Sequence, residues 1–201
     1  MLLTLIRHGQ SVNNAVVHPS EHLPDPPLTE LGQQQSKRLA AYLHQQRTYH
    51  RLYVSPMLRA MQTAKPLADA LDLQPEIWVD LHEAEGVGDR GLNRAAIQAQ
   101  FPSYTIPDEI TDDGWWFISE DRVGCRARAL RVAERLREMD ATERVILVSH
   151  GTFINDLLQA LFGVSMPDDL YILHENTGRT ELTLLSERGH ILHYINRVEH
   201  L

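Results

Sequence analysis

The chain has a single cysteine, Cys125, among its 201 residues, which excludes a disulfide within the chain and a zinc site built on several cysteines. No cysteine-centred motif surrounds Cys125, so we expect a small, inert residue on a helix face. The chain also lacks an apolar run of about 18 residues, the length that a membrane helix needs. A strand-like run begins directly at the N-terminus and leaves no room for a removable signal sequence. We therefore expect a soluble, cytoplasmic protein.

Positive charge is scarce as well. The 19 Lys and Arg residues stand against 27 Asp and Glu residues, for a net charge of −8. Such a surface argues against nucleic acid and acidic membranes as partners, and any bound anion must be held by a local cluster of positive groups. Internal repeats are missing too, and 43% apolar residues suffice for one domain over residues 1–201. The oligomeric state stays open, and a homo-oligomer is compatible with these properties.

Apolar runs and turn signals alternate along the chain as in an α/β protein. We expect a three-layer sandwich in which helices flank a mostly parallel central sheet. Strands are expected at residues 2–8, 51–54, 76–79, 145–148, 181–185 and 191–196, the last two as a hairpin. Helices are expected at residues 29–46, 55–71, 92–100, 122–139 and 152–162. Residues 11–27 are interpreted as a surface loop, and residues 82–120 as an insertion that covers the carboxyl edge of the sheet and the substrate.

Two details of this assignment are specific. Ser55 and Pro56 are expected to be the N-cap and first residue of their helix, because this pair is typical of helix starts. Leu31 is expected on the same apolar helix face as Leu39 and Leu43.

Two histidines end strand-like runs in the same way. His8 follows residues 2–7, His150 follows residues 145–149, and a glycine comes directly after each. Ligands of open α/β sheets gather outside the carboxyl ends of the strands, so the two imidazoles can face one pocket. Arg7 directly precedes His8, which indicates that this pocket receives an anion.

Other polar residues fall at strand ends and helix starts: Asn14 after the first strand, Arg59 near a helix start, Glu83 after the third strand, and Gly151 beside His150. Two guanidinium groups, an imidazole and free N–H groups at helix starts form a site that suits a phosphate dianion. His8 and Glu83 are suitable as the nucleophile and the acid.

Five ordered segments then resemble the motifs of the histidine phosphatase (phosphoglycerate mutase-like) superfamily, phosphatase branch. They are Leu5–Asn14 with its Arg-His-Gly, Asp25–Gln35, Val54–Ala64, Leu81–Glu83 and Val148–Gly151. Together they span nearly the whole chain, and their order makes the resemblance far more specific than Arg-His-Gly alone.

The resemblance implies that His8 is the nucleophile that becomes phosphorylated. A neutral imidazole nitrogen attacks phosphorus while the other ring nitrogen donates to a carbonyl group. Arg7, Arg59 and a charged His150 spread positive charge over the phosphoryl oxygens. Glu83 protonates the leaving oxygen and later deprotonates water, with Glu85 as its competitor. No metal or cofactor is implied.

Asn14 and Gly151 join Arg7, Arg59 and His150 as expected substrate-binding residues, although Asn14 also suits the cap of a turn. His82, His174 and Asn176 have less motif support, and we expect His174 to be structural. Residues 91–94 resemble the mutases of the superfamily rather than its phosphatases. The Trp115-Trp116-Phe117 cluster is interpreted as packing, with a stacking platform for a substrate as the alternative.

We therefore predict a metal-independent phosphomonoester hydrolase that acts through phosphohistidine on a small phosphorylated metabolite. A phosphoglycerate mutase is the alternative enzyme, since it uses the same histidine. A non-catalytic phospho-ligand sensor or scaffold is the alternative of another class. The sequence does not identify the substrate.

Overall fold

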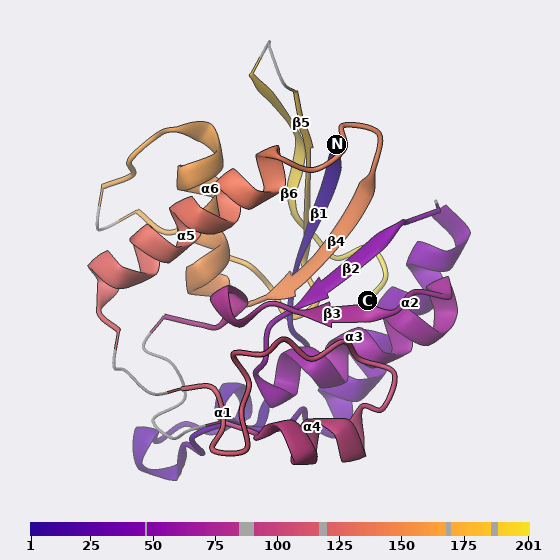
Figure 1. Cartoon of the computed structure of the whole chain (residues 1–201), viewed down its shortest axis with the longest axis vertical. Coiled ribbons are helices and arrows are strands. Elements are labelled where there is room, and N and C mark those ends of the chain that lie inside the picture. The colour runs from indigo at the N-terminus through magenta and orange to yellow at the C-terminus, as the bar shows by residue number, and fades with distance from the viewer. Residues whose placement is uncertain (47, 85–90, 117–119, 168–169, 186–188) are drawn as a thin grey trace.

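The computed structural model describes residues 1–46, 48–84, 91–116, 120–167, 170–185 and 189–201 (Figure 1). The strands are β1 (Leu2–Arg7), β2 (Arg51–Val54), β3 (Pro75–Ile77), β4 (Arg144–Ser149), β5 (Arg179–Leu184) and β6 (His190–Arg197). The helices are α1 (Val12–Ala15), α2 (Glu30–Gln46), α3 (Leu58–Leu71), α4 (Arg94–Gln100), α5 (Arg122–Arg137) and α6 (Gly151–Phe162), with 3₁₀ turns η1 (Pro19–Glu21) and η2 (Val79–Leu81).

All six strands form one sheet in the order β3-β2-β4-β1-β5-β6. The four strands from β3 to β1 run parallel, whereas β5 is antiparallel to both β1 and β6. The predicted mostly parallel sheet and its closing hairpin are therefore confirmed. Arg7 lies opposite Ser149 and Val54 opposite Val148, so β1, β2 and β4 end at the same edge.

Helices cover both faces of this sheet, which confirms the three-layer arrangement. In Figure 1, α5 and α6 lie on one side of the strands, and α2 and α3 lie on the other. Along β4, Val145 and Leu147 join the buried cluster formed with α5 and α6, whereas Ile146 and Val148 join the cluster formed with α2 and α3. This alternation follows the period of two of a strand that is buried on both faces.

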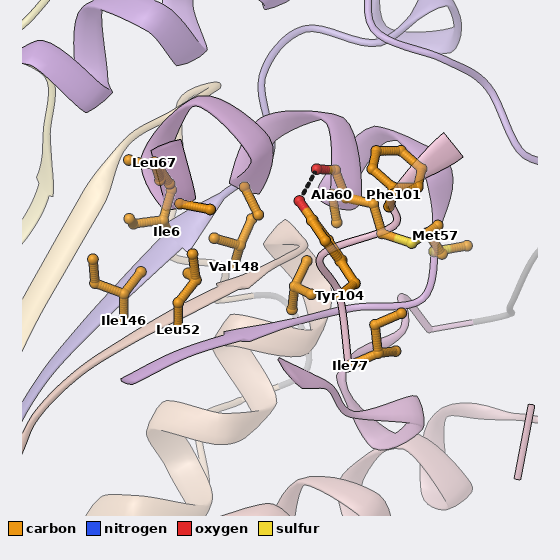
Figure 2. Close-up of a cluster of buried hydrophobic side chains, with 14 of the residues drawn as sticks. Ile6, Leu52, Met57, Ala60, Leu67, Ile77, Phe101, Tyr104, Ile146 and Val148 are labelled. Atoms are coloured by element: carbon orange, nitrogen blue, oxygen red, sulfur yellow. Dashed lines mark hydrogen bonds between the residues drawn. The ribbon is translucent and has the colours of Figure 1, made fainter. Parts of the chain in front are cut away.

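Part of the predicted insertion packs into the α2–α3 side of the core. Figure 2 shows Phe101 and Tyr104 among the side chains of that cluster, and the Tyr104 hydroxyl donates to the Met61 carbonyl oxygen at 2.8 Å. Trp115 and Ile110 belong to the same cluster. Residues 91–116 are thus anchored to α3, and their covering of a substrate stays a prediction.

Four local expectations were wrong. The predicted loop at residues 11–27 contains α1 and η1, and β3 ends at Ile77 before η2 begins. Leu31 is 47% exposed, because the buried face of α2 runs through Gly32, Ser36, Leu39, Ala40 and Leu43 and Leu31 lies beside it. Helix α3 begins at Leu58, since Ser55 still belongs to the sheet edge and donates its N–H to the Val148 carbonyl oxygen.

Cys125 lies buried on the face of α5, as expected, and burial raises the pKa of its thiol. No helix in the described part of the chain is both long enough and apolar enough to cross a membrane.

Candidate active site

The aligned strand ends bring His8 and His150 together. The His8 N–H donates to the Ser149 carbonyl oxygen at 2.9 Å, and the centroids of the two imidazole rings lie 5.0 Å apart. His8 is 3% exposed and His150 is fully buried. The structure therefore places both histidines side by side at the carboxyl edge of the sheet, as the ends of their strands had predicted.

His8 has the tautomer that a nucleophile needs. Its Nδ1 lies 2.7 Å from the Gly9 carbonyl oxygen, which can only accept, so the ring proton is on Nδ1. Its Nε2 then carries the lone pair and accepts from Nε of Arg59 at 3.1 Å. Burial lowers the pKa of His8 well below its ordinary value, and the charges of Arg59 and Arg7 lower it further. The free protein therefore holds a neutral imidazole whose reactive nitrogen points at Arg59.

Arg59 and Arg7 supply the positive charge of the pocket. Arg59 comes from the first turn of α3 and is nearly buried; its Nη1 lies 3.7 Å from an Asp25 carboxylate oxygen. Burial lowers the pKa of Arg59, while the charges of Asp25 and Glu83 oppose this shift. Arg7 donates from Nη1 to the carbonyl oxygen of His174, and its buried Nε has no hydrogen-bond partner among the described residues. His174 therefore contacts the site through its backbone, in keeping with a structural role.

Ser55 orients His150. The Ser55 hydroxyl oxygen lies 2.7 Å from Nε2 of His150 and also accepts the N–H of Met57 at 3.3 Å. A hydroxyl group can donate and accept, so this bond fits either tautomer of the ring. Nδ1 of His150 is buried and has no hydrogen-bond partner within the described residues. Burial lowers the pKa of His150 well below its ordinary value, and Arg59 and His8 contribute, which favours a neutral ring in the free protein over the expected charged one.

Carboxylates occupy the two helix starts at the pocket. Glu83 accepts the N–H groups of Thr152 at 3.3 Å and Phe153 at 3.0 Å, which open α6. Asp25 accepts the N–H of Leu58, at the start of α3, with both carboxylate oxygens at 3.1 Å. The expectation that free helix-start N–H groups hold the phosphate is wrong at these positions, because internal carboxylates already bind them.

Asn14 belongs to a small network around the His8 backbone. Its Oδ1 accepts from the Ser11 N–H at 3.1 Å and from the Asn176 amide at 3.3 Å. Asn176 also donates to the His8 carbonyl oxygen at 3.1 Å. Asn14 thus stabilises the turn after β1, and its contact with a substrate stays a prediction. Asn176, which has less motif support in the sequence, lies 168 residues from His8 along the chain.

Gly151 lies against two side chains at the pocket. A Cβ atom at this position would come within 2.8 Å of the Tyr171 hydroxyl oxygen and 3.6 Å of Nε of Arg7. A glycine fits this close approach, whereas a larger residue would displace Tyr171. Sequence reasoning missed Tyr171, which lies outside every motif, and also Ser55 and Asp25 as site residues, although both lie inside matched segments.

Three further expectations concern the surroundings. Trp115 and Trp116 pack edge-on with ring centroids 5.9 Å apart, and the His82 ring lies 4.8 Å from that of Trp116. This favours the packing interpretation for the two tryptophans; Phe117 and the competing acid Glu85 lie outside the described residues.

In the described parts of the chain, no group of three or more His, Cys, Asp or Glu side chains is arranged to hold a metal ion.

A family model described as the histidine phosphatase superfamily (branch 1) matches residues 3–197. The chain belongs to this superfamily. It is 28% identical to a probable phosphoglycerate mutase of Yersinia enterocolitica, with 80% of this chain and 74% of that protein aligned. It is 36% identical to the PE-PGRS family protein PE_PGRS11 of Mycobacterium tuberculosis over 83 residues, only 41% of this chain and 14% of that one.

A solved structure of a mycobacterial glucosyl-3-phosphoglycerate phosphatase with VO3 is also similar. It superposes with a TM-score of 0.70 and 25% identity, and the alignment covers 97% of this chain and 98% of that one. The α/β fold with its mostly parallel sheet is thus the fold of histidine phosphatases.

Proposed function

We propose that this member of the superfamily is a phosphomonoester hydrolase that forms a phosphohistidine on His8 and acts on a small phosphorylated metabolite. The observation that carries the proposal is the state of His8: a neutral ring with its proton fixed on Nδ1 by Gly9 and its Nε2 lone pair directed at Arg59. A phosphoryl group whose oxygen accepts the N–H of Arg59 would place its phosphorus next to this lone pair.

The first step transfers the phosphoryl group to His8. The Nε2 lone pair forms the N–P bond while the P–O bond to the leaving group breaks, and the bonding electrons stay on the leaving oxygen. The guanidinium groups of Arg7 and Arg59 and the ring of His150 stabilise the charge on the phosphoryl oxygens. Glu83 donates the proton to the leaving oxygen, because its carboxyl group lies at the start of α6, the helix that directly follows His150.

The second step releases inorganic phosphate. Glu83, now ionised, takes a proton from water as the water oxygen attacks phosphorus, and the N–P electrons return to Nε2 of His8. In the free protein Glu83 accepts backbone N–H groups, which hold its carboxyl group at the start of α6. The proton that Glu83 takes from water restores the acid for the next turnover.

Hydrolysis is preferred to a mutase reaction for two reasons. The chain is compact and acidic, with no added basic segment to hold a second acidic group of a phosphoglycerate. The similar mycobacterial structure is that of a phosphatase. The mutase remains the second candidate, because the relative from Yersinia enterocolitica is a probable phosphoglycerate mutase.

The test is phosphate release from a panel of sugar phosphates, phosphoglycerates, nucleotides and phosphoserine, with EDTA present throughout. We expect turnover of at least one monoester, trapping of an acid-labile and base-stable phosphoprotein, and loss of both in His8→Ala. His193→Ala, which changes an exposed histidine on β6, is the matched control and should keep both. Normal turnover by His8→Ala would overturn the mechanism, and transfer between phosphoglycerates without release would favour the mutase.

A further inference from the structure

Tyr171 lies beside Gly151, the residue that follows His150, without belonging to any matched motif. Its hydroxyl oxygen and Nε of Arg7 approach the same point above Gly151, at 2.8 Å and 3.6 Å from the position that a Cβ there would take. The Tyr171 side chain is hydrogen-bonded to that of Thr152, in the first turn of α6. The phenol therefore stands beside the groups that surround the reacting phosphate.

One donor at this point lacks an acceptor. Nε of Arg7 is buried and has no hydrogen-bond partner in the described part of the structure. An unsatisfied buried donor is costly, so an oxygen atom that reaches it is bound favourably. Tyr171 is 50% exposed, so its ring can shift slightly to let an oxygen in.

The Tyr171 hydroxyl keeps its proton under all ordinary conditions. Burial raises the pKa of this phenol and the charge of Glu83 adds to the shift, while Thr152, Arg7 and Arg122 oppose it. A protonated phenol next to a guanidinium is a hydrogen-bond donor for an anion.

We propose that Tyr171 is a substrate-binding residue whose hydroxyl donates to a phosphoryl oxygen that the Arg7 guanidinium also holds, beside Gly151. This inference rests on the proposed function for the presence of a phosphoryl group at the site. It also explains the glycine, because a Cβ atom at residue 151 would lie 2.8 Å from the Tyr171 hydroxyl oxygen and displace it.

The test is a double-mutant cycle with Tyr171→Phe and Gly151→Ala, read by the dissociation constant of inorganic phosphate and by KM and kcat for p-nitrophenyl phosphate. Tyr171→Phe removes only the donor, and we expect phosphate binding to weaken about tenfold with a parallel rise in KM. Gly151→Ala should weaken binding similarly by displacing the hydroxyl. The double variant should then bind phosphate no more weakly than Tyr171→Phe, since both changes remove the same hydrogen bond.

Tyr194→Phe is the matched control on β6, where the hydroxyl accepts from Arg179, and it should bind phosphate as the wild type does. Phosphate binding by Tyr171→Phe within twofold of the wild type, or additive losses in the cycle, would overturn the assignment of Tyr171. A wild-type protein that binds phosphate but hydrolyses no monoester would overturn the proposed function instead, and the binding comparison would still decide the role of Tyr171. Circular dichroism of each variant shows that the fold is retained.

Discussion

Five buried histidines make the stability of this protein sensitive to mild acid. Burial is the main cause that lowers the pKa in every case: well below the ordinary value for His8 and His150, to about 3 for His82, and to about 4 for His174 and His200. In the unfolded chain each imidazole takes up a proton near pH 6.5. Unfolding below this pH therefore binds protons, and the free energy of unfolding falls as the pH falls.

The size of the effect follows from the same values. Each ring that stays neutral in the folded protein costs about 1.4 kcal/mol of stability for every pH unit below 6.5, until its own folded pKa is reached. At pH 5.5 the five rings together cost about 7 kcal/mol. That loss is comparable with the whole stability of a typical domain, about 5–15 kcal/mol. All five residues are at most 9% exposed, so solvent does little to screen the effect.

Urea unfolding followed by circular dichroism at pH 7.5, 6.5 and 5.5 measures this dependence. His200→Gln is the matched variant, because a glutamine amide can still donate to Oγ1 of Thr177, which lies 2.8 Å from Nε2 of His200. Its pH slope should be smaller by about 1.4 kcal/mol per pH unit below 6.5. Equal unfolding free energies at pH 7.5 and 5.5, to within about 1 kcal/mol, would show that these rings carry protons in the folded protein and would refute the reasoning.

Three further outcomes are expected. Arg59→Ala should lower kcat/KM by at least about a hundredfold and weaken vanadate inhibition, because a buried donor to the phosphoryl oxygens is lost; a loss below tenfold would place Arg59 outside phosphate contact. Glu83→Gln should slow an alkyl phosphate by about 10²–10⁴-fold and p-nitrophenyl phosphate far less; if Glu85→Gln shows this leaving-group dependence instead, Glu85 is the acid. Ser55→Ala should lower kcat about tenfold with little change in KM, because the buried His150 ring loses the hydrogen-bond partner of its Nε2; unchanged kcat would leave Ser55 a purely structural role.

Most of the fold could be predicted because it depends on local patterns. Strands such as β4 are short apolar runs with fixed ends, and Arg-His-Gly and Ser-His-Gly mark the same sheet edge. The residues that meet there come from separate matched segments, so His8, Arg59 and His150 could be placed together before their contacts were known.

The errors arose where distant segments decide a local structure. Asp25 caps α3 from 33 residues away, which shifts the helix start beyond the expected Ser55-Pro56 and leaves Ser55 free to orient His150. Glu83 occupies the start of α6 from 70 residues away. Tyr171 reaches the pocket from a loop with no periodic pattern, so nothing in the sequence signalled its position.

The place of β1 in the sheet has a consequence for synthesis on the ribosome. This strand carries Arg7 and His8 at its end and is made first, yet both of its neighbours, β4 and β5, begin only at Arg144 and Arg179. At about 5–20 residues per second, β1 waits for roughly 7–27 s before its first partner exists. During that time its run from Leu2 to Ile6, which is largely apolar, has no sheet to join, so the nascent chain exposes an extended apolar segment. The sheet edge that holds Arg7 and His8 is therefore completed late, when β4 and then β5 pair with the two sides of β1.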